Sequence, residues 1–199
     1  MTKLILLEAM KAFCEERTRD LLLPVQATER DEEPPEDRAP AVYVPRLPEL
    51  RAYAKKAPFI TCGIITGKDS AARDRLRATA VVRSVFCVYH ENEMEGELAL
   101  LNLMERIRIG LLEQVVIGKQ FKLDLEAGIE SLVYPGNPNQ ATNSPFYLGE
   151  MITTWQLPTI ERKVPYGKEG YGNIHRYGAG RGPDCPEGGR HYIPPEEGE

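Results

Sequence analysis

The sequence predicts an α+β fold, a mostly antiparallel sheet flanked by an N-terminal helix and a central amphipathic helix, with an extended C-terminal tail. Two adjoining patterns support this prediction. In Thr79–His90, β-branched and aromatic residues alternate at the period of a strand. From Leu98 to Val116, apolar residues recur at helical spacing. A helix this apolar is expected to pack on a sheet, and the strand before it is the nearest candidate.

Composition limits the classes of protein to consider. With 199 residues, 42% of them hydrophobic, and a net charge of −5, the chain is typical of one soluble domain with extensions. No apolar run reaches 18 residues, and the first seven residues are not a convincing signal peptide, so no membrane span is predicted. The cysteines form no CxxC pair, which favours a reducing compartment. The mild acidity does not favour nucleic-acid binding.

The N-terminal part divides at its prolines. Residues 1–24 are predicted to form the first helix, which Pro24 ends. Residues 25–40, dense in Glu, Asp, Arg and Pro, are predicted to be a solvated loop. The core domain is expected to span 41–164 and to begin with a short strand in Ala41–Arg46. Pro45 confines that strand to the edge of the sheet.

A hairpin with a long polar tip is the next predicted feature. Phe59–Thr66 is expected to pair antiparallel with Thr79–His90, and Gly67–Arg77 is expected to be a charged connection between them. Such a tip is either solvated or inserted into a neighbouring protein. Its candidate interface residues are Lys68, Asp69, Arg73 and Arg75.

An acidic segment, Glu91–Glu97, separates the strand from the helix. Its carboxylates suit the positive end of a helix dipole, and they lack the spacing of a calcium loop. They are candidates for a contact with a basic partner, namely Glu91, Glu93 and Glu95. In the helix, one stripe is predicted to face the sheet: Leu100, Leu103, Met104, Ile107, Leu111 and Val115. Leu98, Leu101 and Leu112 are predicted to widen that stripe.

Three further strands and a tail complete the chain. Phe121–Glu126 and Ile129–Tyr134 are expected to be strands, and Phe146–Ile160 is expected to be the last one, with Trp155 in the core. Residues 165–199 are rich in Gly and Pro and are expected to form an extended arm. Such arms become ordered when tied down, so we expect this one to lie along a neighbouring subunit. Its candidate anchors are Tyr166, Tyr171, Ile174, Tyr177, Tyr192 and Ile193.

Motifs that could carry chemistry are weak. Gly63–Ser70 has three residues between its glycines where a phosphate-binding loop has four, and Asp69 would repel phosphate. The spacing of His175, Cys185 and His191 does not suit a zinc site. On a strand, Cys87 and His90 would point to opposite faces. The sequence therefore predicts no catalytic residues, no metal site and no cofactor.

The order of these elements carries a resemblance to a known family. The segments VVRSVFCVYHENEMEGELALLNLMERIRIGLLEQ, FKLDL and PFYLGEMITTWQLPTIER, which lie within Phe59–Lys163, resemble the tail terminator or tail-completion proteins of long-tailed bacteriophages. In that family a central strand leads into a helix of the LLNLMERIR type. A late strand then carries a Tyr/Phe-x-Gly pattern, here Tyr147-Leu148-Gly149, and ends near a proline, here Pro158.

The resemblance implies a structural, non-enzymatic virion protein of the tail or neck, assembled in the host cytoplasm. It would form a ring, commonly a hexamer, that stops tail-tube polymerisation and joins the tail to the head connector proteins. Its partners would be further copies, the tail tube protein and the connector, with DNA only passing through the lumen and no membrane. Gln26–Pro40 and Tyr166–Glu199 lie outside the family pattern.

Two alternatives remain open at this point. The chain could be another neck or baseplate component with the same fold. It could also be a cytoplasmic ligand-binding or regulatory α+β domain that uses a pocket between sheet and helix.

Overall fold

The computed structural model describes residues 2–27, 33, 35–47, 57–72, 75–134 and 145–159, with the backbone only at 71–72 and 75–76. The chain divides into two compact units, Met1–Ile160 and Glu161–Glu199. The second unit lies outside the described residues, so the predicted arm at 165–199 and its anchoring side chains remain predictions.

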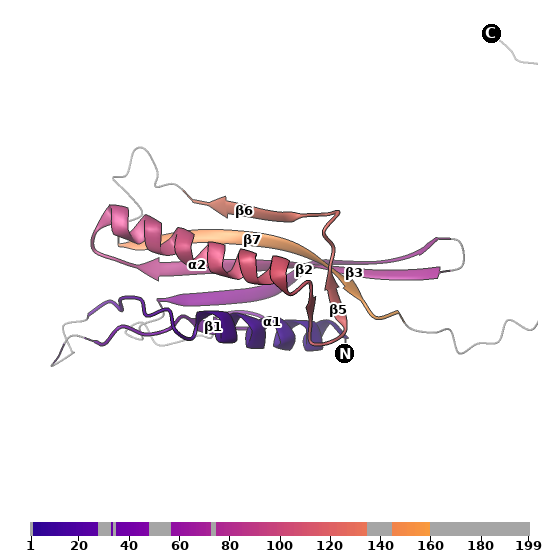
Figure 1. The fold of residues 1–199 in the computed structure, drawn as a ribbon, viewed down its shortest axis with the longest axis horizontal. Helices are drawn as coiled ribbons and strands as arrows, with labels where there is room; N and C mark the ends of the chain where they lie inside the picture. The colour runs from indigo at the N-terminus through magenta and orange to yellow at the C-terminus, as the bar shows by residue number, and fades with distance from the viewer. Residues whose placement is uncertain are drawn as a thin grey trace, which may run out of the picture. The chain divides into compact units, whose positions relative to one another are not determined.

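The first unit confirms the predicted α+β fold (Figure 1). In chain order its elements are α1 (Thr2–Thr18), β1 (Ala41–Tyr43), β2 (Phe59–Ala72), β3 (Arg75–Tyr89), α2 (Glu93–Glu113), β4 (Val116–Ile117), β5 (Phe121–Leu123), β6 (Ile129–Val133) and β7 (Phe146–Leu157). The strands form one sheet in the order β1-β2-β3-β7-β5-β4, and β6 also pairs with β7. Every strand pair is antiparallel except β1 with β2, which is parallel.

Both helices cover the same face of the sheet, and the core lies between the two layers (Figure 1). Alternate residues of β3 and β7 point into it, and the pairing of Ser84 with Met151 and of Val82 with Thr153 aligns the two strands. Trp155 is fully buried there, as predicted, and its indole Nε1 donates a hydrogen bond to the Thr153 hydroxyl at 2.9 Å. The paired strands β3 and β7 thus form the part of the sheet on which α2 packs, whereas α1 packs mainly on β1 and β2.

Two glycines allow α2 to approach the sheet closely. A Cβ on Gly96 of α2 would lie 2.0 Å from the ring of Tyr147, and one on Gly149 of β7 would lie 2.5 Å from the sulfur of Met104. The Tyr/Phe-x-Gly pattern of the last strand therefore marks the place where helix and strand are in closest contact.

The first helix is shorter than predicted. It ends at Thr18, whose hydroxyl donates to the carbonyl of Cys14 at 2.8 Å, and the chain then turns through a hydrogen bond from the Leu21 amide to the Thr18 carbonyl. Leu23 instead forms a β-bridge with Arg38. The extension of the helix to Pro24 was wrong because a turn forms before the proline is reached.

The prediction of a loop at Gly67–Arg77 was also wrong. Strand β2 continues to Ala72 and β3 begins at Arg75, so the two form a long two-stranded arm. The last pair of β3 with β7 is Ala78 with Leu157, and the end of the arm extends past that pair (Figure 1). Backbone hydrogen bonds form this ladder whatever the side chains are, and strands beyond the core need no alternating apolar pattern.

The central helix starts earlier than predicted. It spans Glu93–Glu113 rather than Leu98–Val116, so much of the acidic segment forms its first turns. Asn92 is the N-cap, and its side-chain oxygen accepts hydrogen bonds from the amides of Met94 (3.0 Å) and Glu95 (3.3 Å). A short polar N-cap followed by acidic residues is a start signal that sequence reading can detect.

The helix also buries a narrower stripe than predicted. The predicted inner residues Leu100, Leu103, Met104, Ile107 and Leu111 are 0–4% exposed. Leu98, Leu101 and Leu112 do not widen that stripe, since they are 59%, 48% and 43% exposed on the side away from the sheet. No helix among the described residues is long and apolar enough to cross a membrane.

Candidate interaction surfaces

The two-stranded arm places charged side chains beyond the main body of the sheet. Lys68 and Asp69 are exposed on β2, and Arg77 is exposed on β3. Arg73, and the side chain of Arg75, lie outside the described residues. On its outer side β2 pairs with β1 only over Phe59–Thr61, so in the described part of the chain the rest of this side meets no strand. Unpaired strand edges can add a strand from another chain.

The predicted acidic residues cluster at the start of α2, and all three are exposed. Glu95 lies 3.2 Å from Nε2 of His90, and Glu91 accepts a hydrogen bond from the Tyr89 hydroxyl at 3.2 Å. Burial, together with the Glu91 carboxylate, raises the pKa of Tyr89. These carboxylates therefore stabilise the start of the helix and still present negative charge to the surroundings.

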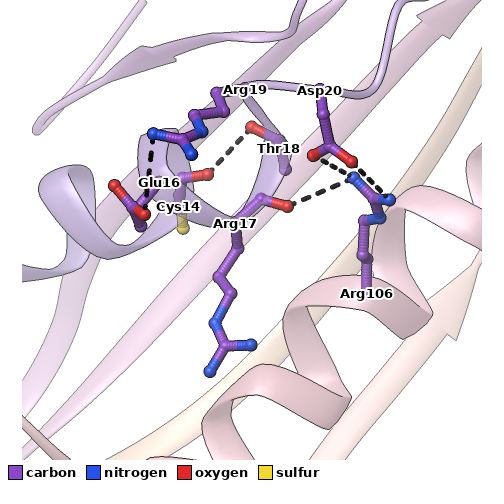
Figure 2. Close-up of polar contacts among 7 residues, drawn as sticks. All are labelled: Cys14, Glu16, Arg17, Thr18, Arg19, Asp20 and Arg106. Atoms are coloured by element: carbon purple, nitrogen blue, oxygen red, sulfur yellow. Dashed lines mark hydrogen bonds and ion pairs between the residues drawn. The ribbon is translucent and has the colours of Figure 1, made fainter.

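A network of ion pairs joins the end of α1 to the flank of α2 (Figure 2). Arg106 binds both carboxylate oxygens of Asp20, at 2.6 and 3.0 Å, and also donates to the carbonyl of Arg17 at 3.4 Å. Arg17 itself reaches Glu113 at 3.0 Å, and its guanidinium lies 5.6 Å from the centre of the Phe13 ring. Arg106 thereby satisfies a carbonyl that the last turn of α1 leaves free.

This junction lines a hollow of about 720 Å³. Its walls carry both signs of charge, from Arg17, Arg19 and Arg106 and from Glu16, Asp20 and Glu113. The hydrogen bonds from Arg106 lower the pKa of Asp20. Because the cations are bonded to the carboxylates, the hollow has no excess charge with which to hold an ionic ligand, and we interpret it as a structural junction. Sequence analysis missed it because Asp20 and Arg106 are 86 residues apart.

The described cysteines behave as small apolar residues. Cys14 of α1 and Cys62 of β2 are fully buried, and the Cys62 sulfur lies 3.4 Å from the Ser84 hydroxyl. The neighbouring Cys62 thiol and burial raise the pKa of Cys14. Burial raises the pKa of Cys87 to about 12. The raised pKa makes Cys14 and Cys87 poor nucleophiles, because the thiolate is the reactive form.

The remaining chemical motifs also gain no support from the geometry. Gly63–Ser70 lies inside β2, whereas a phosphate-binding loop lies between a strand and a helix. Within the described residues, no group of three or more His, Cys, Asp and Glu side chains is placed to hold a metal ion. His175, Cys185 and His191 lie outside those residues.

The sheet has a second face, directed away from both helices. On β7 it carries Phe146 (36% exposed), Leu148 (37%) and the half-buried Ile152, and on β6 it carries Leu132 (49%). In its centre Arg83 and Glu150 form an ion pair, which raises the pKa of Arg83. No described helix packs on this face.

Comparison of the chain with protein-family models and with curated proteins finds no match to either.

Proposed function

We propose that this chain is a structural virion protein that caps the tail tube as a ring and joins the tail to the head connector. The observation that carries the proposal is the two-stranded arm, which extends past the end of β7 and whose β2 edge pairs with no other described strand beyond Thr61. A closed ring needs a heterologous interface, in which one patch of a subunit meets a different patch of the next. A projecting arm is suited to that task because it reaches beyond the subunit that carries it.

Two further features support a place at the end of a tube. The exposed carboxylates Glu91, Glu93 and Glu95 form a negative surface that would repel DNA from the wall of a lumen. Residues 165–199, which we predict to be an extended arm, follow β7 in the sequence, and such an arm would give each subunit a second means of reaching a neighbour. A hexameric ring with tail tube protein on one side and connector proteins on the other is the assembly that we propose.

The alternative of a ligand-binding regulator depends on a pocket between helix and sheet. In the described structure this region is filled by large side chains, among them Trp155, Phe86 and Leu103, each 0% exposed. A ligand of ordinary size would have to displace well-packed core residues, so we favour the structural role. A different neck or baseplate position would use the same surfaces, and the identity of the bound partner distinguishes it.

The test is the mass of the purified protein in solution, alone and with the tail tube protein of the same phage. We expect an assembly near six times 22.4 kDa, either alone or on addition of tubes, and tubes that stop growing once the protein is bound. A stable monomer that leaves tube growth unchanged would contradict the proposal.

A matched pair of variants tests whether the two-stranded arm takes part in assembly. Lys68→Glu reverses a charge on the arm, and Lys122→Glu makes the same change at an exposed position of β5. We expect only Lys68→Glu to weaken assembly. Equal assembly of the two variants would show that the two-stranded arm does not take part in the contact.

A further inference from the structure

The outward side of α2 is unusually apolar for a surface. It carries a set of exposed hydrophobic side chains, interrupted only by Glu105 and Arg108, which we name the outer stripe: Met94 (73% exposed), Leu98 (59%), Leu101 (48%), Ile109 (45%) and Leu112 (43%). These residues recur at helical spacing on the side opposite the buried stripe. A helix that is apolar on two opposite sides is typical of one that is covered on both, and the described part of this chain covers only one.

The sheet likewise has apolar side chains on a face that no described helix covers. Its open face carries the apolar outward residues Val81, Val85, Leu132, Phe146, Leu148 and Ile152, on β3, β6 and β7. Only one end of this face is covered by described residues, where Ala57 and Phe59 pack on Cys87 and Tyr89. A sheet in a two-layer fold normally buries one apolar face, and this one has apolar side chains on both.

The outer stripe and the open sheet face lie on opposite sides of the same subunit. Gly96 of α2 lies against Tyr147, and Met104 lies against Gly149, so α2 packs on the odd-numbered residues of β7. The even-numbered residues Leu148 and Ile152 point the other way because side chains alternate along a strand. Among the described residues, α2 therefore has no sheet on its outer side, and the sheet has no helix on its open face.

The charged residues in the middle of both surfaces are paired within the subunit. Glu105 and Arg108, in the middle of the outer stripe, are joined by two hydrogen bonds, one of 2.8 Å. Arg83 and Glu150 are paired in the middle of the open sheet face. Removing one partner of a buried ion pair is costly, whereas burying a complete pair leaves no charge alone. Of the other charged side chains described on these strands, Glu130 is exposed on the edge strand β6 and Arg77 is exposed on the two-stranded arm, and water can still reach both.

We propose that the outer stripe of one copy packs on the open sheet face of a second copy, and that this contact repeats from subunit to subunit. The lengths agree, since Met94–Leu112 rises about 27 Å as a helix and Phe146–Thr154 rises about 27 Å as a strand. The contact is heterologous, as a ring requires. The inference deepens the proposed function by naming the two surfaces that meet. It rests on that function in one respect, namely that copies of the protein associate with one another.

The first experiment introduces charges into each surface separately. Leu98→Glu with Leu101→Glu places two carboxylates on the outer stripe, and Leu132→Glu with Leu148→Glu does the same on the open sheet face. Leu22→Glu, at a residue that is 61% exposed outside both surfaces, is the control. By light scattering, we expect each double variant to self-associate at least about 100-fold more weakly than the wild type, because unpaired charges would be buried at the contact. The control should assemble like the wild type.

Mixing the two double variants tests the direction of the contact. Each variant keeps one intact surface, so an equimolar mixture should form a heterodimer of twice 22.4 kDa that grows no further. If helices instead paired with helices, the sheet-face variant alone would still dimerise, and the proposal would be overturned. A wild-type protein that remains monomeric at about 100 μM, or double variants that assemble normally, would overturn it as well.

Circular dichroism and thermal unfolding check that each variant is folded. If a glutamate variant does not fold, Leu101→Cys and Ile152→Cys are introduced into separate chains in a Cys185→Ser background and treated with a bismaleimide. The proposal expects cross-linking in the mixture and none for either chain alone, and any other pattern contradicts it. Failure of the proposed function would give a different result. A protein that assembles through these two surfaces but does not bind tail tubes would support the contact and contradict the proposed function.

Discussion

The two sides of α2 are similar in sequence and opposite in environment. Leu103 and Leu101 are two residues apart, which places them about 200° apart around the helix. Leu103 is fully buried against the sheet, whereas Leu101 is 48% exposed. The comparison shows that apolar content alone does not identify a core face. One side of this helix stabilises the subunit, and we propose that the other side joins subunits together.

Alanine substitutions on the two sides should give the largest difference. Leu103→Ala leaves a cavity beneath the helix and should lower the free energy of unfolding by about 2–5 kcal/mol. Leu101→Ala removes the same atoms from the exposed side and should change the stability of the monomer by less than about 0.5 kcal/mol. Urea unfolding at a protein concentration low enough to avoid assembly measures both. Equal losses would show that Leu101 is part of the core.

The close approach of α2 to β7 provides a second test of the inner side. Gly96→Ala would place a methyl group 2.0 Å from the ring of Tyr147. Overpacking of this kind costs about 1–3 kcal/mol, which outweighs the gain of at most about 1 kcal/mol from replacing glycine in a helix. Glu97→Ala, at an exposed neighbouring position, is the control and should change stability little. A Gly96→Ala variant as stable as the wild type would show that the Tyr147 ring can move aside.

Removing the hydroxyl of Tyr147 should have the opposite effect on stability. This hydroxyl is buried and has no hydrogen-bond partner among the described residues, so it adds a desolvation cost to the inner side. Tyr147→Phe should therefore leave stability unchanged or raise it by up to about 1 kcal/mol. Tyr89→Phe is the control, because that hydroxyl donates to Glu91 and its removal should not stabilise the protein. A clear loss on Tyr147→Phe would mean that this hydroxyl does have a partner.

Sequence patterns identified the elements whose side chains meet the core. The alternation in β3, the inner stripe of α2 from Leu100 to Leu111 and the burial of Trp155 all follow from strand or helical spacing, and the structure confirms them. These predictions succeed because burial imposes a period on the sequence.

The errors fall where burial imposes no period, or where a period does not show which side of an element is buried. The arm beyond Lys68 has strands without a core, so its polar side chains looked like those of a loop. Leu98 and Leu101 were assigned to the core because sequence spacing does not show where a helix meets the sheet. The ion pair of Asp20 with Arg106 depends on the packing of two helices that are distant in the chain, and no local signal predicts it.

The ion pair of Asp20 with Arg106 lies between the two sides of α2, and its removal should change stability less than the substitutions above. The hydrogen bonds from Arg106 lower the pKa of Asp20 in the folded protein. A group with a lowered folded pKa stabilises the protein above its unfolded pKa, about 3.9 for aspartate, and this contribution is lost as the pH falls through the folded pKa. The wild type should therefore be slightly more stable than Asp20→Asn at pH 7, and the difference should disappear in strong acid. Because Asp20 is exposed, 1 M salt should also reduce the difference.

A double-mutant cycle with Arg106→Gln separates the ion pair from the other contact of Arg106. The pair-specific energy should vanish at low pH, and the remaining cost of Arg106→Gln should persist, because the guanidinium also donates to the Arg17 carbonyl at the end of α1. If the coupling between Asp20 and Arg106 were instead independent of pH and salt, the junction would be held by packing and not by charge. The border between the two sides of α2 would then be an extension of the core.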